Sequence, residues 1–265
     1  GAAIGRVFES LAEADDELRL TAFTSATGSA GAIAAGDYLK EEFGTRIAAV
    51  EALECPTLLY NGFGEHNIQG IGDKHVPLIH NAMNTDFVVD ISDQATDNLM
   101  VLFNTEAGHQ HLRERMGVPQ AVIDQLCSFG YSSICNVLAA IKVAKQQQLG
   151  PKDVIATVAT DGAGMYASEI DGIVQRDHRG TFDAAAAGEV RARFLDGIDT
   201  EHMLECSHED RLRMFNLGYY TWVEQQGVTF EEFTARESQD FWVETRSIVT
   251  EWDEMIEEFN AAVAV

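Results

Sequence analysis

Five small or hydroxyl-bearing residues occupy a position where the chain could bind an anion: Thr27, Gly28, Ser29, Ala30 and Gly31. The alternating residues 18–23 before them predict a strand, and residues 32–44 after them predict a helix capped by Gly44. Between a strand and a helix, small residues let backbone N–H groups converge on an anion, and hydroxyl groups add donors. A glycine turn formed for packing alone is the alternative, because the GxGxxG dinucleotide pattern is absent.

Histidines and cysteines offer weaker possibilities for chemistry. Five histidines stand in two groups along the chain: His66, His75 and His80, then His109 and His111. An HExxH pair is absent, and the four cysteines form no CxxC pair. Adjacent residues such as Cys206 and His208 seldom form a catalytic dyad. We therefore expect solvated or loop-stabilising histidines, free thiols and no metal site.

The composition excludes several classes of partner. The chain has 265 residues, of which 46% are hydrophobic, enough for one large domain or two small ones. Its 43 acidic and 18 basic residues give a formal net charge of −25, which disfavours nucleic acid and anionic membranes. The acidic surface favours a halophilic, high-salt cytosol, although an acidic protein of an ordinary cell is the alternative. No apolar run is long enough to span a bilayer, and the acidic, amphipathic residues 1–20 do not form a secretory signal, so we expect a cytoplasmic protein.

Hydrophobic periodicity predicts an α/β fold with an open, mainly parallel sheet and flanking helices. A helix over 4–12, the strand at 18–23, the helix at 32–44 and a strand at 46–50 form a βαβ unit. Later segments continue the alternation. Strands are predicted at 87–91 and 153–159. Helices are predicted over 94–126, with a break at 117–119, and over 130–145.

The last third of the chain differs in composition. Residues 170–265 are acidic and helical in pattern, with a capping box at Thr229 and Glu232. Four large residues form one apolar helical stripe: Trp252, Met255, Ile256 and Phe259. We predict an α/β body over 1–169 and an acidic helical extension over 170–265 that packs on it.

One glycine-bent segment, HNIQGIGDKHVP at 66–77, resembles the HxIQGIGxxxxP signature of the cysteine synthase family. This family belongs to the tryptophan synthase β-like, fold type II enzymes that use pyridoxal 5′-phosphate (PLP). Further segments resemble family motifs in the same order along the chain: 27–31 with 36–40 (GDYLK), 49–51 (AVE), 87–93 (FVVDISD), 130–133 (GYSS) and 158–166 (VATDGAGMY).

The resemblance implies a role for each of three segments. The loop 27–31 would hold the cofactor phosphate. Gly70, Ile71 and Gly72 would line the mouth of the active site near cofactor and substrate. Thr160, Asp161 and Gly162 would lie at the pyridine nitrogen end of the ring. The implied reaction is β-replacement or β-elimination on an amino acid, in an enzyme that is usually a homodimer.

Two departures from the family limit this interpretation. The family places Ser or Thr where Gly162 stands, so Thr160 or Asp161 must substitute or the contact is lost. The family's Schiff-base lysine and substrate-carboxylate loop lie N-terminal to every matched segment, and none of the five lysines stands in that context. The chain also lacks an initiator Met, so we expect it to begin at a processed, engineered or internal position, and we expect the catalytic lysine to lie outside it.

Three interpretations follow from these departures. The chain is the C-terminal part of a cysteine synthase-like enzyme that needs a missing N-terminal portion. Alternatively, it is a non-catalytic subunit that binds a phosphate compound or a partner. A third possibility is one half of a split enzyme, with the lysine supplied by another polypeptide.

Overall fold

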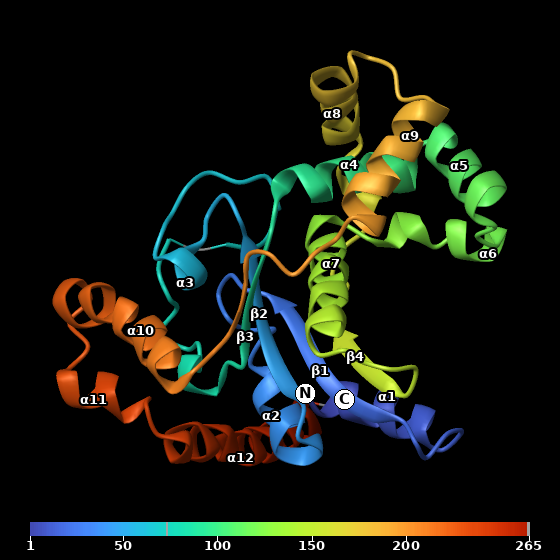
Figure 1. Ribbon diagram of the computed structural model, residues 1–265. Helices are drawn as coiled ribbons and strands as arrows, with labels where there is room; N and C mark the ends of the chain where they lie inside the picture. The colour runs from blue at the N-terminus through green and yellow to red at the C-terminus, as the bar shows by residue number, and fades with distance from the viewer. Residues whose placement is uncertain (73, 264–265) are drawn as a thin grey trace.

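The computed structural model describes residues 1–72 and 74–263 and is built around one five-stranded sheet (Figure 1). The strand order is β4-β1-β2-β3-β5. The strands are β1 (Arg19–Ala26), β2 (Arg46–Ala52), β3 (Phe87–Ile91), β4 (Asp153–Thr157) and β5 (Met203–Glu205). The first four pair in parallel, and β5 joins β3 antiparallel. The predicted α/β fold with a mainly parallel sheet is confirmed.

Helices cover both faces of the sheet. They are α1 (Ala2–Ala12), α2 (Ala35–Phe43), α3 (Thr57–Tyr60), α4 (Asp93–Asn104), α5 (Glu106–Met116), α6 (Gln120–Ile123), α7 (Tyr131–Gln146), α8 (Ala167–His178), α9 (Ala184–Arg191), α10 (His208–Tyr219), α11 (Phe230–Ala235) and α12 (Gln239–Val263). Helix α7 packs on one face and α2 on the other, so β2 and β3 are buried on both sides, as their apolar sequences require. In the described part of the chain no single helix is long and apolar enough to cross a membrane; only residues 120–128 and α7 together, bent by 118°, reach that length and composition.

Local capping chemistry explains where several helices begin and end. The Ser92 hydroxyl accepts from the Gln94 N–H at the start of α4, and Gly44 ends α2 in the left-handed conformation, as the sequence predicts. The predicted capping box at Thr229 is present at α11. The helical stretch over 94–126 is interrupted at two more places than predicted: Thr105 adopts an extended conformation and caps α5, and α6 ends at Ile123.

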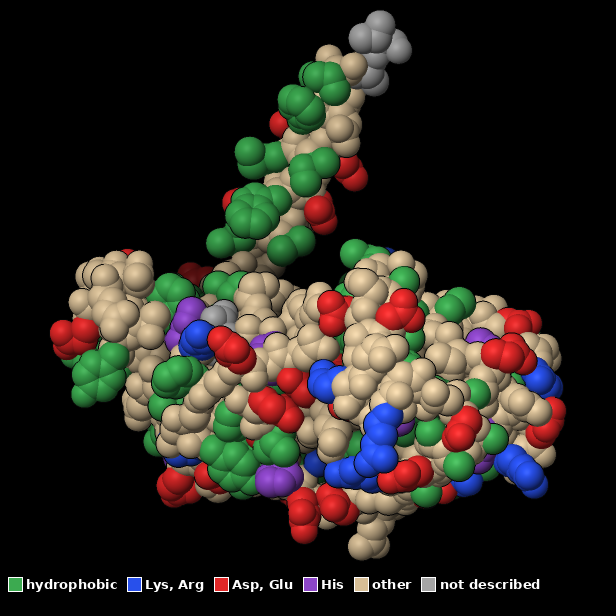
Figure 2. Space-filling model, turned by 90° about the horizontal axis from the view of Figure 1, so that it is seen from above, with side chains coloured by type: hydrophobic (Ala, Val, Ile, Leu, Met, Phe, Trp, Pro, Cys, Tyr) green, Lys and Arg blue, Asp and Glu red, His purple; other side chains and the backbone are tan. Residues whose placement is uncertain are grey.

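Residues 170–263 contribute in two different ways. Helices α8 and α9 bury Ile173, Ala187 and Val190 in the same core as α7, and β5 extends the sheet. This short strand was not predicted. Helix α12 instead leaves the rest of the molecule as a rod, which Figure 2 shows clearly. The division at 169/170 stays a prediction.

A pair of buried acidic side chains crosses from β2 to β3. Glu51 and Asp90 are register partners and are almost fully buried. The Glu51 carboxylate accepts from the N–H groups of Leu58 and Leu59. Apart from Glu51, the Asp90 carboxyl oxygens have no hydrogen-bond partner. Burial, and then the charge of Glu51, raises the pKa of Asp90 to about 9, so the pair holds one proton at neutral pH.

We predict that Asp90→Asn preserves stability at pH 7 and removes a loss of stability at alkaline pH. The raised pKa means that the stability contributed by protonated Asp90 is complete only below the usual pKa of 3.8, falls steadily as the pH rises, and is lost by about pH 9. The asparagine amide cannot ionise and can still donate to Glu51. Thermal unfolding from pH 7 to 10 should show a steeper fall in Tm for the wild type. Parallel curves for the two proteins would contradict the shared proton.

Candidate functional site

The carboxyl ends of four parallel strands meet at one edge of the sheet. The strands β1, β2, β3 and β4 end at Ala26, Ala52, Ile91 and Thr157. Ligands of open α/β sheets bind at this edge, in the crevice outside the strand ends. The loop 27–34 follows β1 there, and the turn 158–162 follows β4.

The loop after β1 presents a row of unused backbone donors. The Thr27 N–H donates to the Val50 carbonyl, and the next backbone hydrogen bond is from the Ala34 N–H to the Ala30 carbonyl. Within the described residues, the N–H groups of 28–33 donate to no protein acceptor. Ala30 has a φ of 67° and is buried, so the loop turns sharply without a glycine at that point. Such a row of free N–H groups can bind an anion.

The loop at 70–72 lies directly against this row. The Gly72 N–H donates to the Thr27 carbonyl at 2.7 Å. A Cβ added to Gly28 would stand 3.6 Å from the Gly70 oxygen and from the Ile71 Cα. Gly70 and Gly72 both have a φ of 82°, which side chains strain. The structure therefore brings two of the three predicted segments into contact.

The third segment is connected through the start of α7. The Asn136 side chain accepts from the Ala26 N–H at 2.7 Å and donates to the Val158 carbonyl at 3.1 Å, so it joins the ends of β1 and β4. One turn earlier, the Ser132 hydroxyl lies 3.3 Å from that of Thr160. Ser132 appeared in the sequence only as part of a motif, and its place beside Thr160 was not predicted.

Asp161 and Gly162 serve different purposes in the turn after β4. The Asp161 carbonyl accepts from the Gly130 N–H, and one carboxylate oxygen accepts from the Tyr166 hydroxyl. The other oxygen, Oδ1, is buried without a partner. A Cβ at Gly162 would stand 2.8 Å from the Cys127 carbonyl oxygen, so close packing requires glycine there. Burial, and then Asp161, raises the pKa of Tyr166 to about 12.

A polar latch holds the loop 66–72 against α4. The Asn67 N–H donates to Asp93 Oδ2 at 2.5 Å, and its side-chain amide donates to Asp97 Oδ1 at 2.8 Å. Arg176 of α8 binds the other oxygen of Asp97 at 2.7 Å. Burial raises the pKa of Asp93 to about 6, although the hydrogen bond from the Asn67 N–H acts in the opposite direction. The fully buried Ile68 anchors the same loop.

We predict that Asn67→Ala loosens this loop without unfolding the protein. The substitution removes the amide donor to Asp97 and leaves the sheet and the Ile68 anchor unchanged. Amide hydrogen exchange at residues 68–72 should speed up, while exchange in β2 and β3 stays unchanged. Gln69→Ala is the matched control, because Gln69 is exposed in the same loop. Equal protection of residues 68–72 in both variants would exclude the latch.

Most histidines and lysines lie elsewhere or have other partners, but the His66 ring lies against Gly72, where an added Cβ would stand 2.1 Å from its Nε2. No group of three or more His, Cys, Asp or Glu side chains among the described residues could hold a metal ion. Burial lowers the pKa of His80 to about 4, and its ring contacts the Thr85 hydroxyl.

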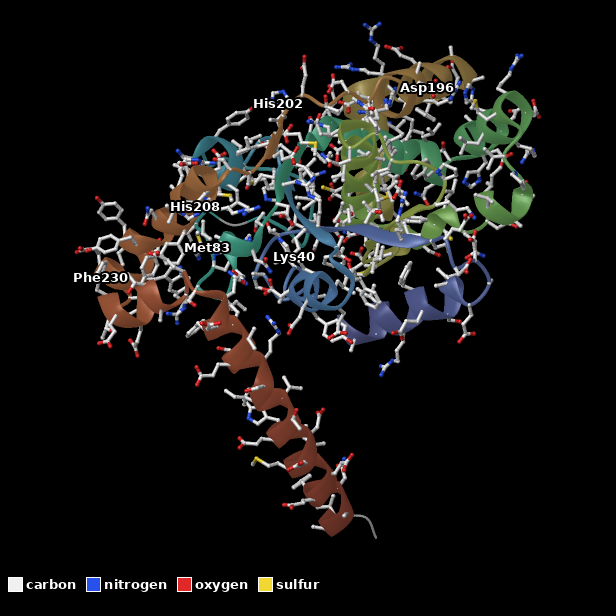
Figure 3. All side chains as sticks on the ribbon, turned by 60° about the horizontal axis from the view of Figure 1, so that its bottom comes forward. Lys40, Met83, Asp196, His202, His208 and Phe230 are labelled. Atoms are coloured by element: carbon white, nitrogen blue, oxygen red, sulfur yellow. The ribbon has the colours of Figure 1, made fainter. Side chains whose placement is uncertain are left out.

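The lysines have other partners. Lys40, labelled in Figure 3, belongs to α2 and binds Asp86. Lys142 and Lys145 donate to backbone carbonyls, and Lys152 binds Asp15. Lys74 lies on the long loop, with its ammonium 5.8 Å from the centre of the Phe63 ring.

Comparison with known proteins supports the sequence resemblance. No known protein-family model matches the chain. The chain is 30% identical over 162 residues to cysteine synthase B of Campylobacter jejuni, which covers 60% of this chain and 46% of that protein. It therefore spans about half the length of this curated relative, and the predicted resemblance to cysteine synthase is confirmed.

Solved structures with partial likeness include a hydrogen sulfide-producing enzyme from Fusobacterium nucleatum, with 20% identity, a TM-score of 0.48 and coverage of 71% of this chain and 48% of that one. Another is the O-acetylserine dependent cystathionine β-synthase from Helicobacter pylori, with 26% identity, a TM-score of 0.42 and coverage of 60% and 45%.

Proposed function

We propose, from the homology of this chain to cysteine synthase over 162 residues, that it forms the phosphate-binding part of a PLP-dependent enzyme. The reaction is β-replacement or β-elimination on an amino acid. The observation that carries the proposal is the loop 28–33, whose free N–H groups lie against the 70–72 loop in a chain of this ancestry.

The residues at the carboxyl edge fit PLP at both ends. The N–H row of the 27–31 loop suits the phosphate, with the Thr27 and Ser29 hydroxyls as further donors. The Ser132 and Thr160 hydroxyls, and the partnerless buried oxygen of Asp161, suit a ring nitrogen. When bound, PLP supplies an electron sink for chemistry at the amino acid's α and β carbons.

The protein's own contribution is binding, orientation and exclusion of water. The 27–31 loop fixes one end of the cofactor. The Gly70, Ile71 and Gly72 backbone closes over that loop. An added Cβ at Gly70 would meet nothing within 4 Å, which leaves room for substrate there, whereas the His66 ring fills the corresponding space at Gly72. Asp161 is held by Tyr166 and by Gly130, so its free oxygen has a fixed position.

A second candidate function is a non-catalytic subunit that binds a phosphate compound or a partner. Lys40, Lys142, Lys145 and Lys152 all donate to groups away from the loop 27–31, which favours this candidate. In the primary proposal the lysine comes from a missing N-terminal portion or from another polypeptide of a split enzyme. Mixing this chain with such a partner restores turnover in the primary proposal and leaves it absent in the second.

We predict that Gly28→Asp abolishes PLP binding by this chain. The added carboxylate would project between the two loops, where it repels the phosphate and blocks the N–H row. Titration of PLP followed by its absorbance and by isothermal calorimetry measures the affinity. Gly28→Ala places only a Cβ at ordinary contact distance and should retain binding within a few-fold.

Gly172→Asp is the matched control for charge, because it adds the same carboxylate to an open, exposed position of α8. It should bind PLP like the wild type. Equal affinity in Gly28→Asp and the wild type would refute the phosphate-loop assignment.

The acidic surface supports a further part of the proposal, a halophilic and cytoplasmic setting. A net charge of −25 destabilises the compact state by self-repulsion, which salt screens. We predict that Tm rises as KCl increases from low to molar concentration, as measured by differential scanning calorimetry. A Tm that falls or stays constant over this range would contradict a high-salt setting.

A further inference from the structure

Helix α12 carries an apolar seam that, beyond its buried first member Trp242, no described part of the chain covers. The beginning of the helix is fixed to the body, because the Gln239 side chain accepts from Asn81 and Arg246, seven residues further on, binds Glu41 of α2 at 2.6 Å. Beyond that point the helix leaves the molecule, as Figure 3 shows, and its hydrophobic side chains stand in the open in Figure 2. The side chains of Trp252 and Phe259 are 59% and 65% exposed, and Ile256 is 55% exposed. An exposed apolar surface of this kind marks an interaction site.

The spacing of the seam identifies the shape of its partner. Seven positions alternate at intervals of three and four: Trp242, Thr245, Val249, Trp252, Ile256, Phe259 and Val263. All except Thr245 are apolar, which matches the a and d positions of three heptads. A heptad seam packs knobs into holes against another helix of the same period. Ile248 and Met255 stand at g positions and widen the apolar surface.

We propose that the partner is α12 of a second copy of this chain, paired antiparallel. In antiparallel pairing each a residue faces a d residue, with a two-fold axis at residue 254. Ile256 then faces Trp252 of the other copy, and Val249 faces Phe259. Each of these layers combines one β-branched and one aromatic side chain, so the volumes are complementary, while the outermost layer pairs Thr245 with Val263. Parallel pairing would instead place Trp against Trp and Val against Val.

Most charges of the helix are compatible with the same arrangement. Five glutamates of the helix occupy outer heptad positions and stay in solvent: Glu244, Glu251, Glu254, Glu257 and Glu258. Asp253 stands at an e position beside the two-fold axis, so the two copies of this one side chain repel each other. Antiparallel pairing also puts the two bodies, each of net charge −25, at opposite ends of the pair, which limits their repulsion. Covering the exposed parts of the seam buries roughly 1,400 Å² in both copies together, within the range of specific interfaces.

Sedimentation equilibrium of the full chain tests the pairing. The wild type should sediment as a dimer of 29.1 kDa chains. Trp252→Glu places a charge in the seam and should raise the dissociation constant on the order of 100-fold or more. Trp252 is exposed in the single chain, so circular dichroism should confirm an unchanged fold.

Thr250→Glu is the matched control, because it adds the same charge at an exposed outer position of α12 and should leave the dimer intact. A wild type that stays monomeric at every concentration overturns the proposal, and so does equal dissociation of the two variants. Loss of the dimer in Thr250→Glu alone also overturns it.

Thiol cross-linking tests the direction of the helices. In a Cys127→Ser background, Trp252→Cys combined with Ile256→Cys should form an intermolecular disulfide on mild oxidation, because the two positions face each other. Either substitution alone should not. A disulfide in the Trp252→Cys single variant would show parallel helices and overturn the antiparallel pairing.

Discussion

The Asn136 side chain is the interaction on which the candidate site depends. It satisfies the Ala26 N–H at the end of β1 and the Val158 carbonyl after β4, two groups that the sheet ladder no longer pairs. Because Asn136 belongs to α7, the same contact fixes the start of that helix, with Ser132, beside the turn at 160. Without this side chain, no hydrogen bond from α7 would hold the loops that follow β1 and β4 in a fixed position relative to each other. The loops can therefore stay open to a ligand while their bases are rigid.

The excess of acid shapes the interior as well as the surface. Asp90 is protonated beside Glu51, and Asp86 is paired with both Lys40 and Arg211. Although basic residues are scarce, two of them pair with this one buried carboxylate. The Asp86 carboxylate also accepts from the Ile47 N–H, which ties the start of β2 to the segment before β3. The strands that end at the candidate site are thus held at their other ends by ion pairs.

Much of the fold followed from local sequence signals, because periodicity and capping are local properties. The apolar run of β3, the cap at Ser92 and the glycine after α2 needed no tertiary information. The strand β5 was missed because three residues carry no periodicity, and only pairing with β3 makes them a strand. The role of Gly162 was also hidden. The sequence suggested a missing side chain at a ligand, whereas the nearby Cys127 carbonyl leaves no room for one. The contact of the 27–31 and 70–72 loops depends on a hydrogen bond across 45 positions of sequence, which only the family resemblance anticipated.

An anion site in so acidic a chain raises an electrostatic question. None of the described Lys and Arg side chains forms a hydrogen bond or ion pair with residues 27–33, so a bound phosphate would rely on backbone N–H groups and hydroxyls. The field of a chain with net charge −25 opposes a dianion at long range. That field is screened beyond about 8 Å at physiological ionic strength and over shorter distances in concentrated salt, while direct N–H contacts at hydrogen-bond distance are not. A phosphate site made of uncharged groups in the loop 27–31 is therefore compatible with an acidic surface. As the salt concentration rises, the surface charge weakens phosphate binding less.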